Sequence, residues 1–296
     1  MSQTVLITGS SSGFGLLTAR TLLEKGHTVF ATMRDPSGRN AANAGDLHTF
    51  AAGTSGTLHV LDLDVTSDAS VEAAVKQALD LEGRIDVVVN NAGYGSGGYA
   101  EAFTMDQFQR SFEVNVFGVQ RVNRAVLPAM RGQGSGLLIL VSSTMGRIVL
   151  PFAAPYTAAK YAVEGLAESY RYELASAGID VVIVEPGGFG TNFLANMAPA
   201  DDEARIASYG PLAEIPQQFW GGLGHLFEGE GAPDPQDVAD AISHLIDTPA
   251  GSRPLRTVVD PMTGGEGPTA INQLTDQIQE QMLSGMGMSD LIAVQA

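Results

Sequence analysis

Short apolar runs alternate with longer helix-like segments along this chain, and this alternation limits the possible folds more than any other feature. Several of the short runs are apolar throughout and do not alternate apolar with polar residues. That pattern is typical of strands buried on both faces of a parallel sheet. The alternation of such strands with helices predicts an α/β fold, with a doubly wound parallel sheet and helices on both of its faces.

The runs expected to form the sheet are short and rich in β-branched and aliphatic residues. They are Thr4–Thr8, Thr28–Thr32, Leu58–Asp62, Val87–Val89, Gly136–Val141, Asp180–Val184 and Thr257–Val259, about seven strands in all. The expected helices are Gly15–Lys25, Ser70–Leu81, Met105–Arg131, Pro155–Ala177, Pro235–Asp247 and an amphipathic helix near Ile271–Leu283. Because no linker or internal repeat divides these elements, we expect a single domain.

One region between the sheet elements breaks the rhythm. Residues 189–232 contain three prolines, the single tryptophan of the chain, Trp220, and several glycines. Long insertions of this kind are often functional, so we interpret this one as a substrate lid, with a passive surface loop as the alternative. Residues 1–260 then form the main domain. Residues 261–296 form a C-terminal extension that packs on this domain or at an interface between subunits.

The formal charge of −17, from 33 acidic and 16 basic residues, argues against binding to nucleic acid or to an anionic membrane. We interpret the excess acid as a solvated surface, with a salt-adapted source as the alternative. The first expected strand begins at Thr4, which leaves no room for a leader, and no apolar stretch approaches the roughly 18–20 residues that span a bilayer. These features predict a cytoplasmic protein. With no cysteine and no metal-ligand spacing among its five histidines, the chain is expected to hold no metal.

A glycine-rich turn directly follows the first expected strand and opens the first helix. Its glycines allow the backbone to approach a pyrophosphate, which then lies at the positive end of the helix. The spacing Gly-x-x-x-Gly-x-Gly differs from the usual Gly-x-Gly-x-x-Gly fingerprint, and an ordinary strand-to-helix connection is the alternative. The turn predicts nucleotide binding by Gly9, Ser11, Ser12, Gly13, Phe14 and Gly15.

The end of the second strand is the place where NAD and NADP are usually distinguished, by an acidic residue or an arginine respectively. Met33 stands where the acidic residue is expected, and Arg34 follows it. The forked, permanently charged guanidinium suits a 2′-phosphate. A one-residue slip would instead place Asp35 at the ribose, and Arg34 would then be an ordinary surface charge. We predict that NADP(H) is preferred and that NAD(H) is possible.

Tyr156 and Lys160 are four residues apart within an expected helix, which places both side chains on one face. An ammonium beside a phenol favours the phenolate and so lowers the tyrosine pKa from about 10. Such a tyrosine is suited to general acid or base catalysis near neutral pH. Because Tyr-x-x-x-Lys also arises by chance, the pair alone is weak evidence of an active site.

Together with other motifs in the same order, these residues resemble the classical short-chain dehydrogenase/reductase family. The resemblance covers about Thr4–Thr191 and, more weakly, extends to Asp260. It implies a Rossmann-like fold that binds a nicotinamide dinucleotide. Beyond the glycine turn, Arg34, Tyr156 and Lys160, the implied cofactor residues are Asp64 and Val65 on the adenine side, Asn91, Ala92 and Gly93 after the fourth strand, and Pro186, Gly187, Phe189 and Thr191 near the carboxamide. Phe14 replaces a commoner isoleucine or leucine, an apolar change that should leave phosphate binding intact.

The resemblance also implies a catalytic set. Asn115 matches the asparagine of the family, and Ser143 lies thirteen residues before Tyr156, the family spacing. The implied roles are proton transfer to or from the substrate oxygen by Tyr156, and stabilisation of that oxygen by Ser143. Lys160 would lower the tyrosine pKa and bind the nicotinamide ribose, while Asn115 would anchor a water that connects Lys160 to solvent. The neighbouring hydroxyl of Ser142 and a purely structural Asn115 are the alternatives.

Two segments, 31–35 and 185–189, look like those of members that act on retinol, steroids or other hydrophobic alcohols and ketones. The expected activity is that of an NADP(H)-dependent alcohol dehydrogenase or carbonyl reductase acting on a small hydrophobic substrate. Alternatives are a dinucleotide-sensing regulatory protein without turnover, or a lyase or epimerase on the same fold. A homodimer or homotetramer is expected. The side chains that we expect to line an apolar substrate pocket are Tyr94, Phe193, Leu194 and Trp220.

Overall fold

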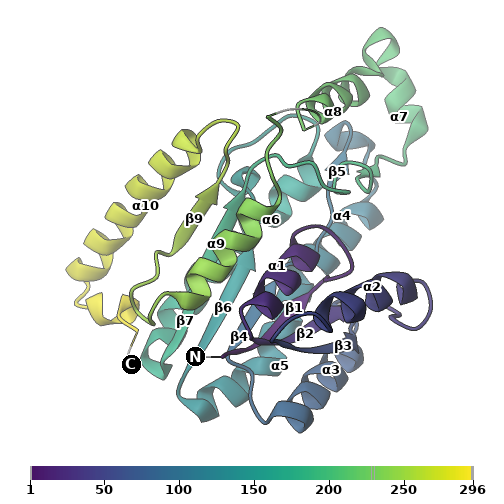
Figure 1. Ribbon diagram of the computed structural model, residues 1–296. Coiled ribbons are helices and arrows are strands. Elements are labelled where there is room, and N and C mark those ends of the chain that lie inside the picture. The colour runs from purple at the N-terminus through teal and green to yellow at the C-terminus, as the bar shows by residue number, and fades with distance from the viewer. Residues whose placement is uncertain (1, 228, 230, 295–296) are drawn as a thin grey trace.

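The computed structural model describes residues 2–227, 229 and 231–294. Seven parallel strands form one sheet in the order β3-β2-β1-β4-β6-β7-β9 (Figure 1). Their bounds are β1 (Thr4–Thr8), β2 (Thr28–Met33), β3 (Thr57–Asp62), β4 (Val87–Asn90), β6 (Gly136–Val141), β7 (Ile179–Pro186) and β9 (Arg256–Val259). The strand order reverses between β1 and β4, which makes their carboxyl ends the expected place for a ligand. The predicted seven-stranded, doubly wound parallel sheet in a single domain is confirmed.

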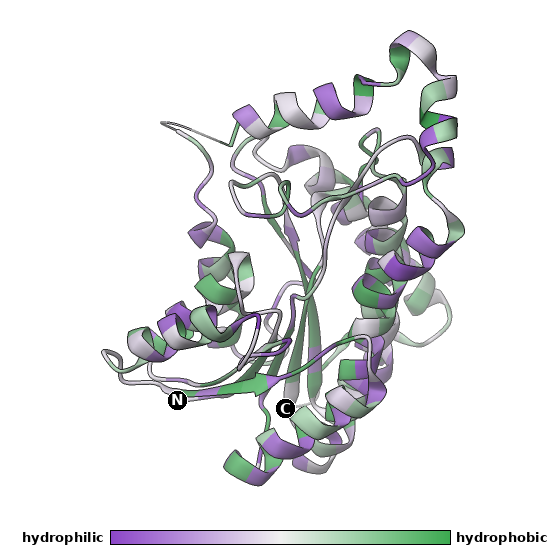
Figure 2. Cartoon of the chain, turned by 90° about the vertical axis from the view of Figure 1, so that its right-hand side faces the viewer, coloured by the Kyte–Doolittle hydropathy of each residue, from purple (hydrophilic) through white to green (hydrophobic). Residues whose placement is uncertain are grey.

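Helices cover both faces of this sheet and bury its apolar strands (Figure 2). On one face lie α1 (Gly13–Glu24), α2 (Ala41–Ala51) and α9 (Gln236–Asp247). On the other lie α3 (Asp68–Glu82), α5 (Gly118–Gln133) and α6 (Ala154–Leu174). Strand β7 is buried along its whole length, and its middle, Val181–Val184, is apolar throughout, as expected when helices pack on both sides.

The single helix predicted over Met105–Arg131 is interrupted. Helix α4 (Met105–Phe112) leads into a π-helical turn at Glu113–Phe117, and α5 continues from there. A π turn inserts one extra residue and re-aims the side chains around it, and such turns are frequent at functional sites. Asn115 lies in this turn, so the π turn determines the position of this candidate site residue.

The predicted lid, residues 189–232, has secondary structure that the sequence did not predict. It contains β8 (Ala198–Pro199), which pairs with β5 (Ser96–Gly97), and the helices α7 (Glu203–Ser208) and α8 (Ile215–His225). These helices lie beyond the carboxyl edge of the sheet, at the top of Figure 1. Residues 228 and 230 of the predicted lid lie outside the described residues.

Side chains of the lid are bonded to the domain below it. The Tyr99 hydroxyl donates to the carbonyl of Leu212 at 2.8 Å, and the Tyr99 ring stacks on Tyr209 with 3.7 Å between centroids. Nε1 of Trp220 donates to the carbonyl of Phe152 at 3.1 Å. The lid is therefore packed against the domain in this structure.

The C-terminal extension forms α10 (Glu266–Gly285), longer at both ends than the predicted helix. It runs beside the edge strand β9 (Figure 1). Residues 295–296 of the predicted extension, and residue 1 of the predicted main domain, lie outside the described residues. Within the part of the chain that the structure describes, no helix combines the length and apolar character needed to cross a bilayer.

Candidate active site

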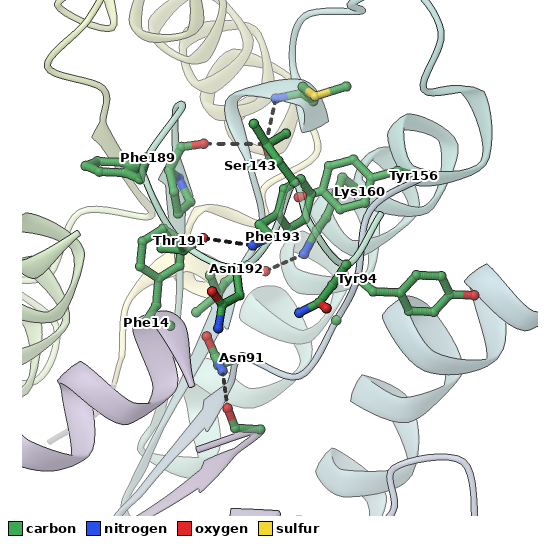
Figure 3. Close-up of a pocket in the computed structure, with 18 of the residues that line it drawn as sticks. Phe14, Asn91, Tyr94, Ser143, Tyr156, Lys160, Phe189, Thr191, Asn192 and Phe193 are labelled. Atoms are coloured by element: carbon green, nitrogen blue, oxygen red, sulfur yellow. Dashed lines mark hydrogen bonds between the residues drawn. The ribbon is translucent and has the colours of Figure 1, made fainter. Parts of the chain in front are cut away.

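A cavity of about 1090 Å³ lies along the carboxyl ends of the central strands (Figure 3). Its walls come from the segments that follow β1, β2, β3, β4, β6 and β7, from the start of α6, from the lid, and from residues 260–268. Of the predicted site residues, all but Gly15 and Asn115 line it. This is the position at which doubly wound sheets bind their ligands.

The glycine turn at one end of the cavity is held in a tight conformation. Gly9 has φ +72°, and a Cβ on Gly15 would lie 2.5 Å from the carbonyl oxygen of Gly9. The Asn91 amide donates to the carbonyls of Thr8 and Gly9 at 2.9 and 3.1 Å. Helix α1 begins at Gly13, and the side chain of Ser12 makes no capping bond to it. The first amides of α1 thus remain available to an anion, which fits the pyrophosphate of a dinucleotide.

The segment after β2 brings two arginines, Arg34 and Arg39, to the cavity. Asp35 adopts a left-handed backbone (φ 49°), and its carboxylate accepts a hydrogen bond from the backbone N–H of Arg39 at 2.9 Å. The Asp35 carboxylate is therefore hydrogen-bonded within its own turn, and Asp35 does not line the cavity. The sequence did not identify Arg39 as a site residue, because its side chain reaches the cavity only once this turn has folded.

Asp64 follows β3 and lines the cavity near these arginines. Its carboxylate accepts hydrogen bonds from the N–H and hydroxyl of Thr66 at 2.9 and 2.7 Å. Burial acts to raise the pKa of Asp64. Hydrogen bonds from Thr66 and the charges of Arg34 and Arg39 outweigh that effect and hold the pKa below its ordinary value. Asp64 is thus an ionised acceptor at neutral pH.

Asn115 lies just behind the cavity wall, 1% exposed. Its amide donates to the carbonyls of Ser111 and Tyr94 at 3.0 and 3.2 Å, and its oxygen accepts from the N–H of Tyr94 at 3.2 Å. The two bonds to Tyr94 tie the π turn to the segment after β4. Asn115 therefore fixes the backbone beside Asn91–Gly93 and does not itself line the pocket.

Tyr156, Lys160 and Ser143 lie together in the middle of the cavity (Figure 3). Nζ of Lys160 lies 5.5 Å from the centre of the Tyr156 ring and donates to the carbonyl of Val141 at 2.7 Å. Oγ of Ser143 donates to the carbonyl of Pro186 at 3.4 Å and accepts from the N–H of Met145 at 3.1 Å. All three side chains are buried, so water is largely excluded from them.

Burial dominates the electrostatics of this pair. It raises the pKa of Tyr156 to about 12, against an opposing hydrogen bond with Ser143. It lowers the pKa of Lys160 to about 8, against the opposing charge of Glu164. The predicted lowering of the tyrosine pKa is therefore wrong, because removal of the phenolate from water is the largest effect on Tyr156 and raises its pKa.

The segment after β7 forms the opposite wall. Pro186, Gly187, Phe189 and Thr191 all line the cavity. Phe189 packs edge-on against Phe14 of the glycine turn, with 5.5 Å between ring centres. The aromatic contact joins the two segments that were predicted to hold the two halves of a dinucleotide.

The far end of the cavity is apolar. The rings of Tyr156 and Phe193 are 5.2 Å apart, and Phe193 and Trp220 pack on the cluster around Tyr156. The predicted pocket residues Tyr94, Phe193, Leu194 and Trp220 all line this cavity. Further apolar lining residues that were not predicted are Ile148, Leu150, Phe219, Leu223, Phe227, Met262 and Pro268. Across the described ranges, no three histidine or acidic side chains are grouped so as to hold a metal ion.

Residues 3–202 match the family described as short chain dehydrogenase. Because this match covers more than half of the chain, the protein belongs to the short-chain dehydrogenase/reductase family, and it is an NAD(P)-dependent oxidoreductase of that family. The uncharacterized oxidoreductase YusZ of Bacillus subtilis (strain 168) is 39% identical over 248 residues, 81% of this chain and 83% of the relative. Retinol dehydrogenase 8 of Homo sapiens is 36% identical over 251 residues, 82% of this chain and 78% of the relative.

Solved structures of similar proteins agree with this assignment. A short-chain dehydrogenase from Streptomyces avermitilis is 30% identical, with a TM-score of 0.75 and coverage of 98% of both chains. An actinorhodin polyketide ketoreductase with NADPH is 29% identical (TM-score 0.72, covering 90% of this chain and 97% of that one). A 3-ketoacyl-(acyl-carrier-protein) reductase from Brucella melitensis with NADH is 27% identical (TM-score 0.69, 88% and 97%). Both forms of the dinucleotide thus occur among these relatives.

Proposed function

We propose that this protein is an NADP(H)-dependent alcohol dehydrogenase or carbonyl reductase for hydrophobic substrates, with Tyr156 as general acid and base. One arrangement carries the proposal. Buried Tyr156, Ser143 and Lys160 lie between an apolar, lid-covered end of the cavity and an end formed by the glycine turn and two arginines. The first end suits a hydrophobic substrate, and the second suits the phosphates of NADP(H).

The buried groups have distinct parts in the proposed reaction. In reduction the Tyr156 hydroxyl donates its proton to the substrate oxygen, and in oxidation the phenolate removes it. The Ser143 hydroxyl hydrogen-bonds the same oxygen and stabilises its negative charge. A bound nicotinamide supplies or accepts the hydride. Because burial raises the Tyr156 pKa to about 12, the phenol keeps its proton at neutral pH, and this favours the acid role.

Lys160 and Asn115 have supporting roles in the proposed reaction. The Lys160 ammonium would bind the ribose hydroxyls of the nicotinamide nucleotide, and its charge favours the phenolate of Tyr156. With a pKa of about 8, Lys160 is mostly protonated at pH 7. Asn115 would anchor a water that connects Lys160 with solvent.

The same fold also occurs in proteins of two other functional classes. A dinucleotide-sensing protein without turnover would be expected to lose catalytic residues, yet Asn115, Ser143, Tyr156 and Lys160 are all present. A lyase or epimerase on this fold usually changes that set. The same observation therefore favours the oxidoreductase over both alternatives.

Arg34→Ala is expected to raise the KM for NADPH roughly 10- to 100-fold, the value of a charge-assisted hydrogen bond, and to change the KM for NADH much less. Arg34 lines the cavity together with Arg39, while Asp35 is engaged in its own turn. Steady-state kinetics with both cofactors measures the difference. Arg131→Ala, at an exposed position on α5, is the control and should leave both values unchanged. Equal losses for NADPH and NADH in Arg34→Ala would refute contact with the 2′-phosphate.

A carbonyl panel tests the substrate class. NADPH oxidation should be fast with retinal, a ketosteroid or decanal and slow with acetone, because only the larger compounds fill the apolar end of the cavity. Trp220→Ala is expected to lower kcat/KM for the best large substrate about tenfold, as burial of an aromatic side chain implies, and to change it little for acetone. Leu81→Ala, 51% exposed on α3, is the control. A preference for acetone in the wild type would contradict the proposal.

Self-association as a homodimer or homotetramer stays a prediction. Large apolar side chains are exposed on α10, where Leu274, Ile278 and Met282 are 60%, 55% and 52% exposed. Exposed apolar residues at helical spacing are common at protein interfaces. Light scattering of the purified chain measures the oligomeric state directly.

A further inference from the structure

A buried cluster of charged side chains lies behind Tyr156 and Lys160, and the catalytic steps proposed above assign it no role. On α6, Tyr156, Lys160, Glu164 and Glu168 follow one another at intervals of four residues, so they lie along one side of the helix. Lys160 and Glu164 are 6% and 2% exposed. The side of α6 that carries the candidate catalytic pair therefore continues directly into two acidic residues.

Arg256 of β9 is the centre of this cluster. Its Nε lies 3.0 Å from Oε2 of Glu164 and 3.4 Å from Oε1 of Glu185, and another nitrogen pairs with Glu168. Its Nη1 lies 3.0 Å from Oδ1 of Asp276 on α10. With its side chain 2% exposed, this guanidinium fixes the Glu164 carboxylate in an environment with little screening by water.

Helix α10 closes the cluster from outside. Asn272 of α10 donates to Oε2 of Glu185 at 2.7 Å, and the Arg147 guanidinium bonds Thr275 one turn further on at 2.9 Å. Glu185 immediately precedes Pro186, whose carbonyl accepts from Ser143. The cluster is thus linked to the active site twice, along α6 from Glu164 to Lys160 and along β7 from Glu185 to Pro186.

The charge of Glu164 acts on Lys160. Burial disfavours the Lys160 ammonium and lowers its pKa to about 8, and the Glu164 carboxylate one turn away opposes that effect. The charged groups that face Glu164 itself come from three elements. They are Lys160 on its own helix, Arg256 on β9 and Glu185 on β7, with Arg147 and Asp276 beyond Glu185.

We propose that Glu164 is a positioning residue for the reaction, which acts through its charge by keeping Lys160 protonated beside Tyr156. Arg256 and α10 hold Glu164 in turn, so the C-terminal helix is part of the support of the active site. This inference rests on the proposed function, since it assigns a partner to the same lysine. A purely structural role for Glu164 would stabilise the fold without changing how Lys160 titrates.

Glu164→Gln separates these roles, because it keeps the shape of the side chain and removes its charge. Loss of an opposite charge next to an ammonium lowers the pKa of that ammonium, here by about one unit or more. The alkaline limb of the pH profile of kcat, measured with the panel carbonyl that the wild type reduces fastest, should therefore move to lower pH by a similar amount. Glu164→Asp keeps the negative charge on a shorter side chain. It should therefore move the alkaline limb in the same direction but by a smaller amount.

Glu168→Gln is the matched control. Glu168 also lies on α6 and also pairs with Arg256, but it is two turns from Lys160, so its loss should leave the alkaline limb in place. A second measurement needs neither cofactor nor turnover. Reductive methylation of Lys160 followed by mass spectrometry across pH should give a lower midpoint in Glu164→Gln than in the wild type or Glu168→Gln.

The outcomes distinguish this inference from the proposed function. A folded Glu164→Gln chain whose profile and Lys160 methylation midpoint coincide with the wild type would overturn the inference. If that variant does not fold, coincidence of Glu164→Asp with the wild type would overturn it. Neither result bears on proton transfer by Tyr156, which the Tyr156→Phe variant tests separately. Conversely, an active Tyr156→Phe enzyme would contradict the proposed function. It would not affect the conclusion drawn from the Lys160 methylation midpoints.

Discussion

Tyr156→Phe is expected to lower kcat about 10²- to 10⁴-fold, the range that a positioned general acid or base contributes. The substitution removes one hydroxyl and leaves a ring of nearly the same shape. That ring keeps its packing against Phe193, and Lys160 keeps its bond to the carbonyl of Val141. The Kd for NADPH, measured by fluorescence titration, should therefore change little while turnover is lost.

Tyr161→Phe is the control for this experiment. Tyr161 follows Lys160 on the same helix, is 43% exposed, and its hydroxyl donates to the carbonyl of Arg147 outside the cavity. Removal of that hydroxyl tests whether any tyrosine change on α6 disturbs the enzyme. If Tyr156→Phe retained the turnover of Tyr161→Phe, another group would have to be the proton donor.

The central sheet was predictable from the sequence because its strands are buried on both faces. Val87–Asn90 and Ile179–Pro186 are apolar almost throughout, and such runs have few alternatives in a chain with α/β alternation. Helix α2 was missed for the opposite reason. Its sequence contains Gly45 and buries only Ala44 and Leu47, so its apolar face is too narrow to be recognised.

The lid helices were missed because their sequence contains residues that usually break helices. Pro216 lies in the first turn of α8, where a missing N–H costs nothing, and Gly221, Gly222 and Gly224 lie within the helix. The sequence analysis interpreted this region as a substrate lid and assigned no helix to it. Packing of Trp220 on the cluster of Met145, Ala153 and Tyr156 contributes to holding this glycine-rich helix, and that contact joins segments that are far apart in the sequence.

The candidate site was predictable wherever local spacing carries the chemistry. The offset of four from Tyr156 to Lys160 and the offset of thirteen from Ser143 to Tyr156 identified side chains that the fold does bring into one cavity. The direction of the Tyr156 pKa was not predictable, because it depends on burial that only the folded chain creates. Glu185 accepts a hydrogen bond from Asn272, 87 residues later on α10, a contact that no local spacing in the sequence predicts.

Arg256→Met is expected to lower the free energy of unfolding by about 3–5 kcal/mol, the cost of breaking a buried ionic group by removal of one partner. The guanidinium is 2% exposed and pairs with the carboxylates of Glu164, Glu168, Asp276 and Glu185. Methionine fills much of the same volume, so most of the loss is electrostatic: acidic groups remain buried without their central cation. Urea unfolding followed by circular dichroism measures the change.

The loss is expected to be larger at pH 8 than at pH 6. Burial and the charge of Glu164 already raise the pKa of Glu185 to about 8, and removal of the nearby Arg256 cation raises the pKa of Glu185 further. The folded variant then binds more protons than the unfolded chain in this range, so it gains stability as the pH falls. Lys76→Met, which breaks the exposed pair with Asp80 on α3, should cost only about 0.5 kcal/mol at either pH. A loss in Arg256→Met no larger than in this control would mean that the cluster does not depend on its central cation.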